Sequence, residues 1–207
     1  MYTKEQIHQA FVERHSLYVQ QLLYKGNVAI VGLGGLGSNV AVALTRMGVG
    51  HIHIIDFDIV DITNLNRQQY FLEHIGMYKT EALKQQLLKI NPYIDIEIDC
   101  TKITEQNIKP LLYKNDIICE ALDNPETKAM LVNNVLEHFP EKKLIAASGL
   151  AGYSSSNDIQ TRRISKNFYL CGDGMYQENG LMAARAALCA CHEANMIARL
   201  LLGEESV

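Results

Sequence analysis

Apolar positions follow two different periods along this chain of 207 residues. Over residues 2–24 they recur at helical spacing, at Ile7, Phe11, Leu17 and Leu22, which predicts an amphipathic helical segment. Farther on, short apolar runs alternate with stretches of helical period. This pattern predicts strands at 27–31, 51–55, 94–98, 116–120 and 143–147 and helices at 38–47, 80–90, 104–113 and 126–138. The alternation is typical of a Rossmann-like α/β fold, in which a mainly parallel sheet carries helices on both faces.

The pattern changes beyond residue 149. Two strands are expected near 159–164 and 167–170, and they predict a small antiparallel extension near the C-terminus. A final helix at about 181–202 is rich in alanine, and small side chains let another helix or a second subunit approach closely.

Composition narrows the function classes. The net charge of −4 provides no global basic field, so neither nucleic acid nor an anionic membrane is expected as the main partner. No apolar run approaches the roughly 20 residues that a membrane helix needs. The five cysteines include no C-x-x-C pair, so neither a disulfide framework nor a structural zinc site is expected. With no signal peptide recognisable, we expect a cytoplasmic location.

A glycine-rich loop joins the first predicted strand to the following helix. Its glycines, Gly32, Gly34, Gly35 and Gly37, permit a tight turn and bring backbone N–H groups and a helix N-terminus close to a phosphate. Asp56 ends the next strand, where an acid can bind a ribose hydroxyl. These features predict a nucleotide site, and alone they also permit a nicotinamide-dependent oxidoreductase.

Polar residues beyond the loop favour ATP over a dinucleotide. They fall near the carboxyl edge of the predicted sheet, at Asp58, Asn64, Arg67, Lys79, Asp123 and Asn124. A triphosphate needs a clamp of cations and a metal held by a carboxylate such as Asp123, whereas a dinucleotide site does not usually need both Arg67 and Lys79. The alternative is that both cations are solvated surface charges.

Taken in order, these motifs resemble the ThiF/MoeB family, relatives of the ubiquitin-activating enzymes. The resemblance rests on the glycine loop and on Asp56-Phe57-Asp58, Asn64-Leu65-Asn66-Arg67-Gln68, Gly76-x-x-Lys79, Ile90-Asn91-Pro92 and Asp123-Asn124. It covers residues 27–150 closely and the helix from 180 more loosely, and it is strongest to the short, single-domain ThiF proteins. On this basis residues 1–26 form an N-terminal helical segment and residues 27–207 a ThiF-type nucleotide-binding domain.

The resemblance implies an ATP- and Mg²⁺-dependent adenylyltransferase of thiamine-thiazole synthesis. Such an enzyme activates the Gly-Gly C-terminus of a small ubiquitin-like sulfur carrier, similar to ThiS, as an acyl-adenylate. Alternatives within the family are a MoaD-like carrier, a tRNA base or a peptide as acceptor. A protein that retains the fold without catalysis is a further alternative.

Residue roles follow from the same resemblance. The glycines, with Gly35 foremost, and Asn64 would contact phosphate, Asp56 the ribose, and Asn124 would line the site. Arg67, Lys79 and Asp123 would be catalytic, with Asp123 holding Mg²⁺ through ATP.

Three further expectations concern sulfur chemistry and assembly. Cys171 is the one cysteine considered for sulfur transfer, although a packing role is favoured. Relatives suggest a homodimer in which an arginine of one subunit reaches the partner's ATP, and Arg14 is the candidate. The alternative for Arg14 is a surface position on an amphipathic helix.

Overall fold

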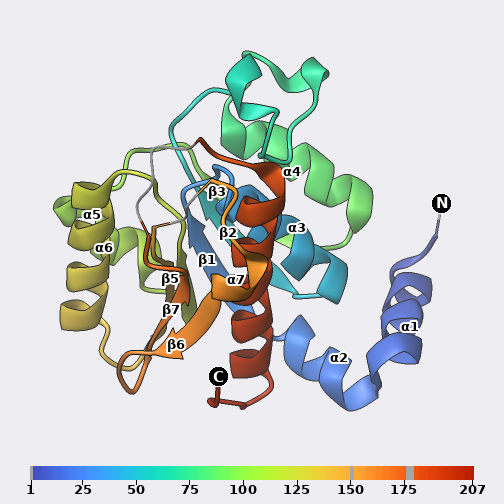
Figure 1. Ribbon diagram of the computed structural model, residues 1–207. Helices are drawn as coiled ribbons and strands as arrows, with labels where there is room; N and C mark the ends of the chain where they lie inside the picture. Colours follow the sequence, from blue (N-terminus) through green and yellow to red (C-terminus); the bar gives the residue numbers. More distant parts are fainter. Residues whose placement is uncertain (1, 150–151, 176–179) are drawn as a thin grey trace.

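The computed structural model describes residues 2–149, 152–175 and 180–207. Its central feature is one seven-stranded sheet with the strand order β3-β2-β1-β4-β5-β7-β6 (Figure 1). The strands are β1 (Asn27–Val31), β2 (His51–Ile55), β3 (Asp95–Asp99), β4 (Ile117–Glu120), β5 (Lys143–Ala147), β6 (Gln160–Arg163) and β7 (Phe168–Gly172). All neighbouring strands are parallel except β6 and β7, which pair antiparallel at one edge. The predicted fold class is confirmed.

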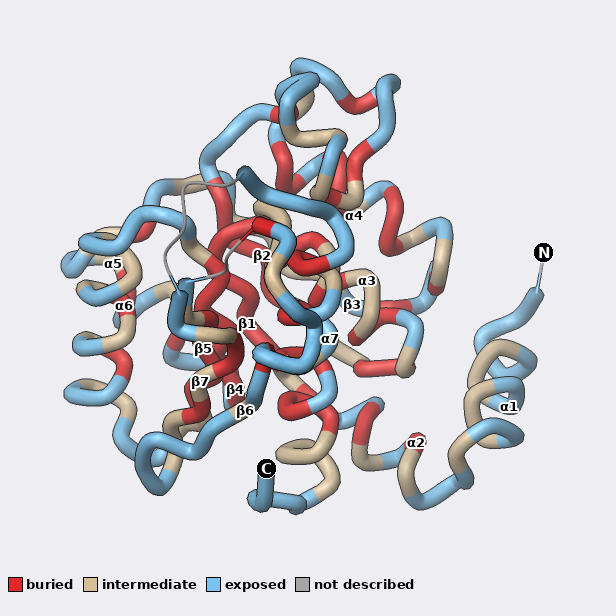
Figure 2. Tube along the Cα trace, in the orientation of Figure 1, coloured by how far each residue is buried: buried red, intermediate tan, exposed pale blue. Residues whose placement is uncertain are grey.

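Helices cover both faces of the sheet, and Figure 2 shows the buried residues concentrated between these layers. The helices are α1 (Lys4–His15), α2 (Leu17–Tyr24), α3 (Gly37–Met47), α4 (Lys79–Ile90), α5 (Glu105–Leu112), α6 (Pro125–His138) and α7 (Ala183–Leu201). One hydrophobic cluster joins α3, α4 and α7 to the sheet, and a second joins α5 and α6 to the opposite face. No helix in the described parts of the chain is long and apolar enough to cross a bilayer.

The alanines of α7 serve packing inside this chain. Ala186, Ala190, Ala194 and Ala198 recur every fourth residue, are buried, and lie on the side of α7 that packs against α3 and the sheet. Their small side chains therefore already have a role in bringing two helices together. The alanine content of α7 consequently gives no support of its own to a dimer face.

The N-terminal segment forms two helices and not one. Ser16 separates α1 from α2, with a φ of 83° that is uncommon for a residue with a side chain. Helix α2 is anchored by Gln20, which is buried and donates to the carbonyl of Gly48 at 3.2 Å. Helix α1 has no buried residue and stands at the periphery of the molecule (Figure 1).

Helix α7 carries a carboxyl group that is buried in the core. Glu193 is fully buried, and its Oε2 atom has no hydrogen-bond partner among the described residues. Burial, followed by the nearby charge of Glu120, raises the pKa of Glu193 well above its usual range. The folded state therefore favours the protonated, neutral form of this side chain.

We expect the stability contribution of Glu193 to fall as pH rises. Because its pKa is raised in the folded state, its contribution is complete below the unfolded pKa of about 4.3 and is lost as pH rises through the folded pKa. In Glu193→Gln the side chain cannot ionise, so the melting temperature of the variant relative to wild type should increase with pH. Each kcal/mol of difference in the free energy of unfolding should shift the melting temperature by about 2–4 °C in a chain of this size. Glu137→Gln, an exposed position on α6, is the control. A difference that stays constant from about pH 5 to about pH 9 would contradict the prediction.

Candidate functional site

A large cavity opens at the carboxyl edge of β1, β2 and β4. We call it the edge pocket, and its volume is about 1160 Å³. Most of the residues that the sequence predicted for the site line it: Gly32, Gly34, Gly35, Asp56, Asp58, Arg67, Lys79, Asp123 and Asn124. Gly37 and Asn64 are not among the residues that line it.

The glycine loop closes tightly at its two ends. Gly32 has a φ of 93°, and a Cβ there would lie 2.7 Å from the carbonyl oxygen of Ala121. A Cβ on Gly37 would lie 1.8 Å from the carbonyl oxygen of Gly32, which no side chain can tolerate. Gly37 is therefore required for the first turn of α3 to pack on the loop, and this explains its place outside the pocket lining. Gly34 and Gly35 lie on the pocket side of the loop, where backbone N–H groups can meet a phosphate.

Asp56 holds the glycine loop in place. Its Oδ2 accepts a hydrogen bond from the backbone N–H of Leu33 at 2.6 Å, and its Oδ1 accepts one from the N–H of Asp58 at 2.8 Å. The residue is only 9% exposed, so both hydrogen bonds are largely shielded from water. Each carboxylate oxygen keeps a second lone pair that a ribose hydroxyl can use.

The two predicted cations reach the pocket from the segment between β2 and α4. Lys79 is buried at the start of α4, and its Nζ lies 2.8 Å from Oδ2 of Asp58. Arg67 donates from Nη1 to Oδ1 of Asn66 at 2.8 Å. A buried ammonium beside one carboxylate still has two N–H donors to direct toward an anion. Asn64 instead accepts the backbone N–H of Asp61 at 3.0 Å and stabilises a short 3₁₀ turn.

Asp123 and Asn124 occupy the loop between β4 and α6. Asn124 caps α6 by accepting the backbone N–H of Thr127 at 2.8 Å, and Asp123 is exposed toward the pocket. Its free carboxylate is a hard oxygen donor, which suits Mg²⁺. The other two predicted carboxylates differ from Asp123: Asp56 is buried, and Asp58 forms an ion pair with Lys79.

Glu120 does not line the edge pocket but directly precedes the lining residues Ala121 and Leu122, and it was not predicted from the sequence. It is fully buried at the end of β4, where its Oε1 accepts the N–H of Leu122 at 2.7 Å and its Oε2 lies 2.5 Å from Nζ of Lys128. Burial raises the pKa of Glu120, while the charge of Lys128 opposes that shift. The two bonds bracket Asp123 from both sides and fix the loop that carries it.

Some residues that line the edge pocket were not predicted either. They include Lys102, Lys128, Ser148, Gly174 and Ala186. Ser148 directly follows β5, so the rule that ligands bind at the carboxyl edge of parallel strands was the one available signal for it. The others come from segments with no recognisable motif.

Cys171 and Arg14 lie away from the reacting groups expected in the edge pocket. Cys171 is fully buried on β7, and burial raises the pKa of its thiol to about 12. Sulfur transfer requires an accessible thiolate, so this environment favours a packing role. Arg14 is exposed on α1, at the periphery of the molecule in Figure 1, and does not line its own chain's pocket.

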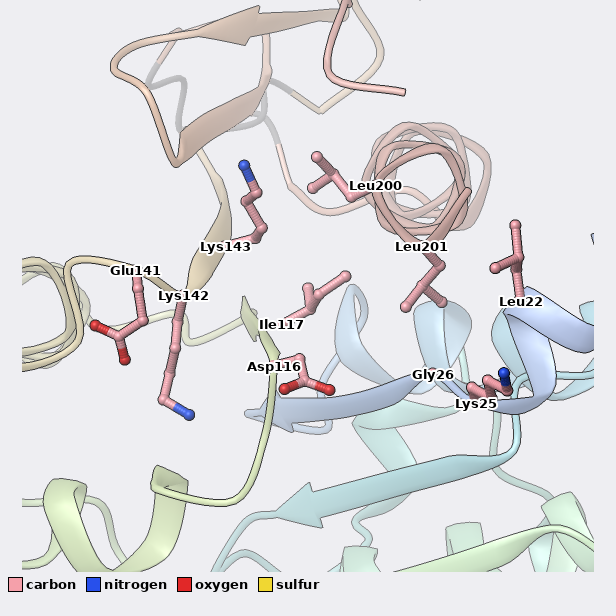
Figure 3. Close-up of a pocket in the computed structure, with 10 residues that line it drawn as sticks. All are labelled: Leu22, Lys25, Gly26, Asp116, Ile117, Glu141, Lys142, Lys143, Leu200 and Leu201. Carbon is pink, nitrogen blue, oxygen red and sulfur yellow. The ribbon is translucent and has the colours of Figure 1, made fainter. Parts of the chain in front are cut away.

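A second cavity of about 460 Å³ lies at the opposite, amino edge of the sheet (Figure 3). Figure 3 shows Lys142 and Lys143 pointing in opposite directions from the start of β5. Lys142 donates to the carbonyl of Tyr113 at 2.9 Å, and Lys143 lies 2.5 Å from Oε1 of Glu205. Both ammonium groups thus already hold parts of the chain together.

A group of possible metal ligands lies on the outer strands of the sheet, at His53, Glu97 and Asp99. The two ring nitrogens of His53 lie 3.2 Å from Oδ1 of Asn115 and 2.8 Å from Oδ2 of Asp99. Both nitrogens thus have protein partners, and the group is explained as a hydrogen-bonded network that joins β2, β3 and the start of β4.

Comparison with known proteins places these features in context. Residues 4–206 match the ThiF family. A segment of 136 residues, 65% of this chain, is 36% identical to the adenylyltransferase and sulfurtransferase UBA4 of Debaryomyces hansenii but spans only 30% of that protein. A segment of 146 residues is 32% identical to the tRNA threonylcarbamoyladenosine dehydratase of Haemophilus influenzae, covering 70% of this chain and 55% of the relative.

Solved structures show the same fold over nearly the whole chain. The E. coli dehydratase TcdA in complex with ATP superposes with a TM-score of 0.88 at 20% identity, covering 98% of this chain and 97% of TcdA. E. coli MccB with ATP gives a TM-score of 0.72 at 24% identity, covering 89% of this chain and 58% of MccB. With the family match over 4–206 and the ordered motifs gathered in one pocket, the chain belongs to the ThiF family.

Proposed function

We propose that this protein binds ATP in the edge pocket and adenylates a carboxylate. The observation that carries the proposal is the gathering of Arg67, Lys79 and Asp123 around one glycine loop. Two cations and an unpaired carboxylate beside a helix N-terminus match the charge of a triphosphate with its metal. Relatives named as adenylyltransferases, and related structures named as complexes with ATP, support the same assignment.

The same geometry disfavours the nicotinamide alternative. Dinucleotide binding requires the glycine loop and an acid that binds the ribose, such as Asp56. It does not explain the buried Lys79 or the exposed carboxylate of Asp123. Burying an ammonium is costly. Asp58 offsets part of that cost, and the two N–H donors that remain on Lys79 suit a bound triphosphate. Lys79 is only 6% exposed and therefore favours ATP.

In the proposed reaction the acceptor carboxylate attacks the α-phosphate of ATP. An oxygen–phosphorus bond forms to give an acyl-adenylate, and the bond to the β-phosphate breaks to release pyrophosphate. No protein nucleophile is needed, because the enzyme acts by positioning the two anions and neutralising their charge. Gly34 and Gly35 would hold phosphate oxygens, Arg67 and Lys79 would face the charge that develops on the leaving pyrophosphate, and Asp123 would hold Mg²⁺.

The acceptor we propose first is a small ubiquitin-like sulfur carrier with a Gly-Gly C-terminus, as in thiamine-thiazole synthesis. Two proteins named adenylyltransferase and sulfurtransferase, UBA4 and MOCS3, are relatives in sequence. The chain spans about 30% of those proteins, so their full activities and partners are not transferred.

A second candidate acceptor is a carboxylate on a modified tRNA nucleoside. It is favoured by one observation: TcdA aligns along 97% of its own length, whereas the carrier activators extend far beyond this chain. A threonylcarbamoyl group carries a carboxylate, so the same activation chemistry applies.

A homodimer would complete the site in our proposal. Arg14 cannot be placed in its own chain's pocket, because α1 stands apart from it (Figure 1). An arginine at the end of an exposed helix could instead reach the pocket of a second copy. We therefore include a partner arginine over the ATP phosphates as part of the proposal.

Ligand selectivity tests the nucleotide part of the proposal. We expect ATP with Mg²⁺ at about one hundred times its Kd to stabilise the protein by about 2.7 kcal/mol, seen as a rise in melting temperature. NADH at the same concentration should leave the melting temperature unchanged. Stabilisation by NADH without stabilisation by ATP would contradict the proposal and favour a nicotinamide-dependent oxidoreductase.

A further inference from the structure

The edge pocket has a second group of lining residues besides the phosphate-binding ones, and we call it the second wall. It comes from the segments after β5 and β7 and from the start of α7, and its residues are Ser148, Gly149, Gly174, Gly180, Leu181 and Ala186. None of these six carries a charge, and five are glycine, alanine or serine. A wall of small, uncharged residues leaves room for an extended backbone and adds no cation to the pocket.

Arg185 ties the parts of this wall together from behind. It does not line the pocket, and its side chain is 6% exposed. Its Nη1 donates to the backbone carbonyl of Ser154 at 2.6 Å and also to that of Ser155, and its Nη2 forms an ion pair with Asp173. One guanidinium therefore joins α7 to two segments that lie on either side of the β6–β7 hairpin.

Asp173 and its neighbours connect this ion pair to residues of the second wall. The side chain of Asp173 is 1% exposed, and its Oδ1 accepts the N–H of Met175 at 2.9 Å. Between them, Gly174 donates its N–H to Oγ of Ser148 at 3.0 Å. Arg185 thus acts on Gly174 and Ser148, two wall residues, through Asp173.

The neighbour of Arg185 along α7 fixes the distance between the two walls. Ala186 lines the pocket, and a Cβ placed on Gly35 would lie 3.5 Å from the Ala186 Cβ. The first turn of α7 thus packs against the glycine loop through Ala186 and is joined to the other segments of the second wall through Arg185. A planar guanidinium suits this role, because its five N–H donors reach several acceptors in fixed directions.

We propose that Arg185 is a positioning residue for the acceptor: through Asp173 it sets the wall along which the acceptor's carboxylate-bearing end approaches the α-phosphate. The inference rests on the proposed adenylation. It distinguishes two sides of one pocket, with Arg67 and Lys79 serving ATP and Arg185 serving the acceptor.

The test compares Arg185→Met with Arg199→Met, a partly exposed arginine at the other end of the same helix. Because Arg185→Met removes the cation that forms an ion pair with the buried carboxylate of Asp173, a second variant, Arg185→Met/Asp173→Asn, removes both charges together. Three quantities are measured: ATP affinity by calorimetry, hydrogen exchange of residues 152–158 and 172–175, and the KM for a Gly-Gly-ended carrier in pyrophosphate exchange.

We expect ATP affinity to change less than twofold in the Arg185 variants, while both segments exchange faster and the KM for the carrier rises roughly tenfold or more. Arg185→Lys should recover only part of the effect. Arg199→Met should match wild type. Unchanged carrier KM in the double variant, or ATP affinity that falls in parallel with it, would overturn the inference. If the wild-type protein shows no pyrophosphate exchange with any carrier, the proposed acceptor is wrong. Hydrogen exchange then decides the role of Arg185, and unaltered protection of both segments in the Arg185 variants rejects it.

Discussion

Replacing Arg67 or Lys79 with alanine should lower the rate of adenylation by about 10²–10³, with a much smaller effect on ATP affinity. Preorganised charges that face charge developing in a transition state typically contribute about 2.7–4 kcal/mol. Lys79 should show the larger effect, because it is buried and its position is fixed by Asp58 at 2.8 Å. The measurement is single-turnover adenylate formation, with ATP affinity measured separately by calorimetry.

Lys89→Ala provides the matched control for Lys79. Lys89 lies on the same helix α4 but is exposed, and it pairs with Glu73 at 3.4 Å. Exposed pairs of this kind contribute about 0–1 kcal/mol, so its removal should change neither rate nor affinity appreciably. Arg67→Lys should restore part of the lost rate, since a point charge cannot reproduce the planar fork of a guanidinium. Equal behaviour of all the alanine variants would mean that the phosphate clamp lies elsewhere.

Asp56→Ala should weaken ATP binding by about tenfold to a hundredfold and slow the bound reaction much less. The loss has two parts: a ribose contact, and the two backbone hydrogen bonds by which Asp56 holds Leu33 and Asp58. Hydrogen bonds to a charged group contribute about 1.5–3 kcal/mol each, and contacts that are equal in ground and transition states affect binding rather than turnover.

Two further variants accompany this test, one at the same position and one as a control. Asp56→Asn keeps the size of the side chain but places an N–H₂ group opposite one of two backbone N–H donors, so its affinity should also fall. Asp61→Ala, in the following loop, removes an exposed capping residue and should leave ATP affinity unchanged. Normal ATP affinity with collapsed turnover in Asp56→Ala would show that the residue acts in the chemical step.

Most of the fold could be predicted from local patterns in the sequence. Runs such as Asn27–Val31 and His51–Ile55 are short, apolar and followed by turns or helices, so their type and order follow from periodicity alone. The glycine loop was equally readable, because Gly32 and Gly37 are dictated by backbone geometry within six residues of one another. The position of the break at Ser16 could not be predicted from the sequence, because no glycine or proline marks it.

The residues in and around the site also fall into those that the sequence predicted and those that it did not. Residues carried by ordered motifs, such as Arg67 and Lys79, were found because each follows a strand or begins a helix at the edge where ligands bind. Glu120 and Arg185 were missed because their partners are defined by tertiary structure: Arg185 meets carbonyls 30 and 31 residues away, and no spacing rule joins them. The alanine pattern of α7 was ambiguous for a related reason, since close packing within a chain and between chains demands the same small residues.

The central claim is that a carboxylate-bearing acceptor is adenylated in the edge pocket. The most direct measurement is Mg²⁺-dependent exchange of labelled pyrophosphate into ATP, run with ThiS-like and MoaD-like carriers, with carriers lacking the terminal glycine, with tRNA and with no acceptor. We expect exchange with a Gly-Gly-ended carrier, its loss when that glycine is deleted, and its loss in Lys79→Ala. Exchange with tRNA alone would move the acceptor to the second candidate and keep the chemistry. Exchange at full rate without any acceptor, or none with any acceptor while ATP still binds, would contradict the account.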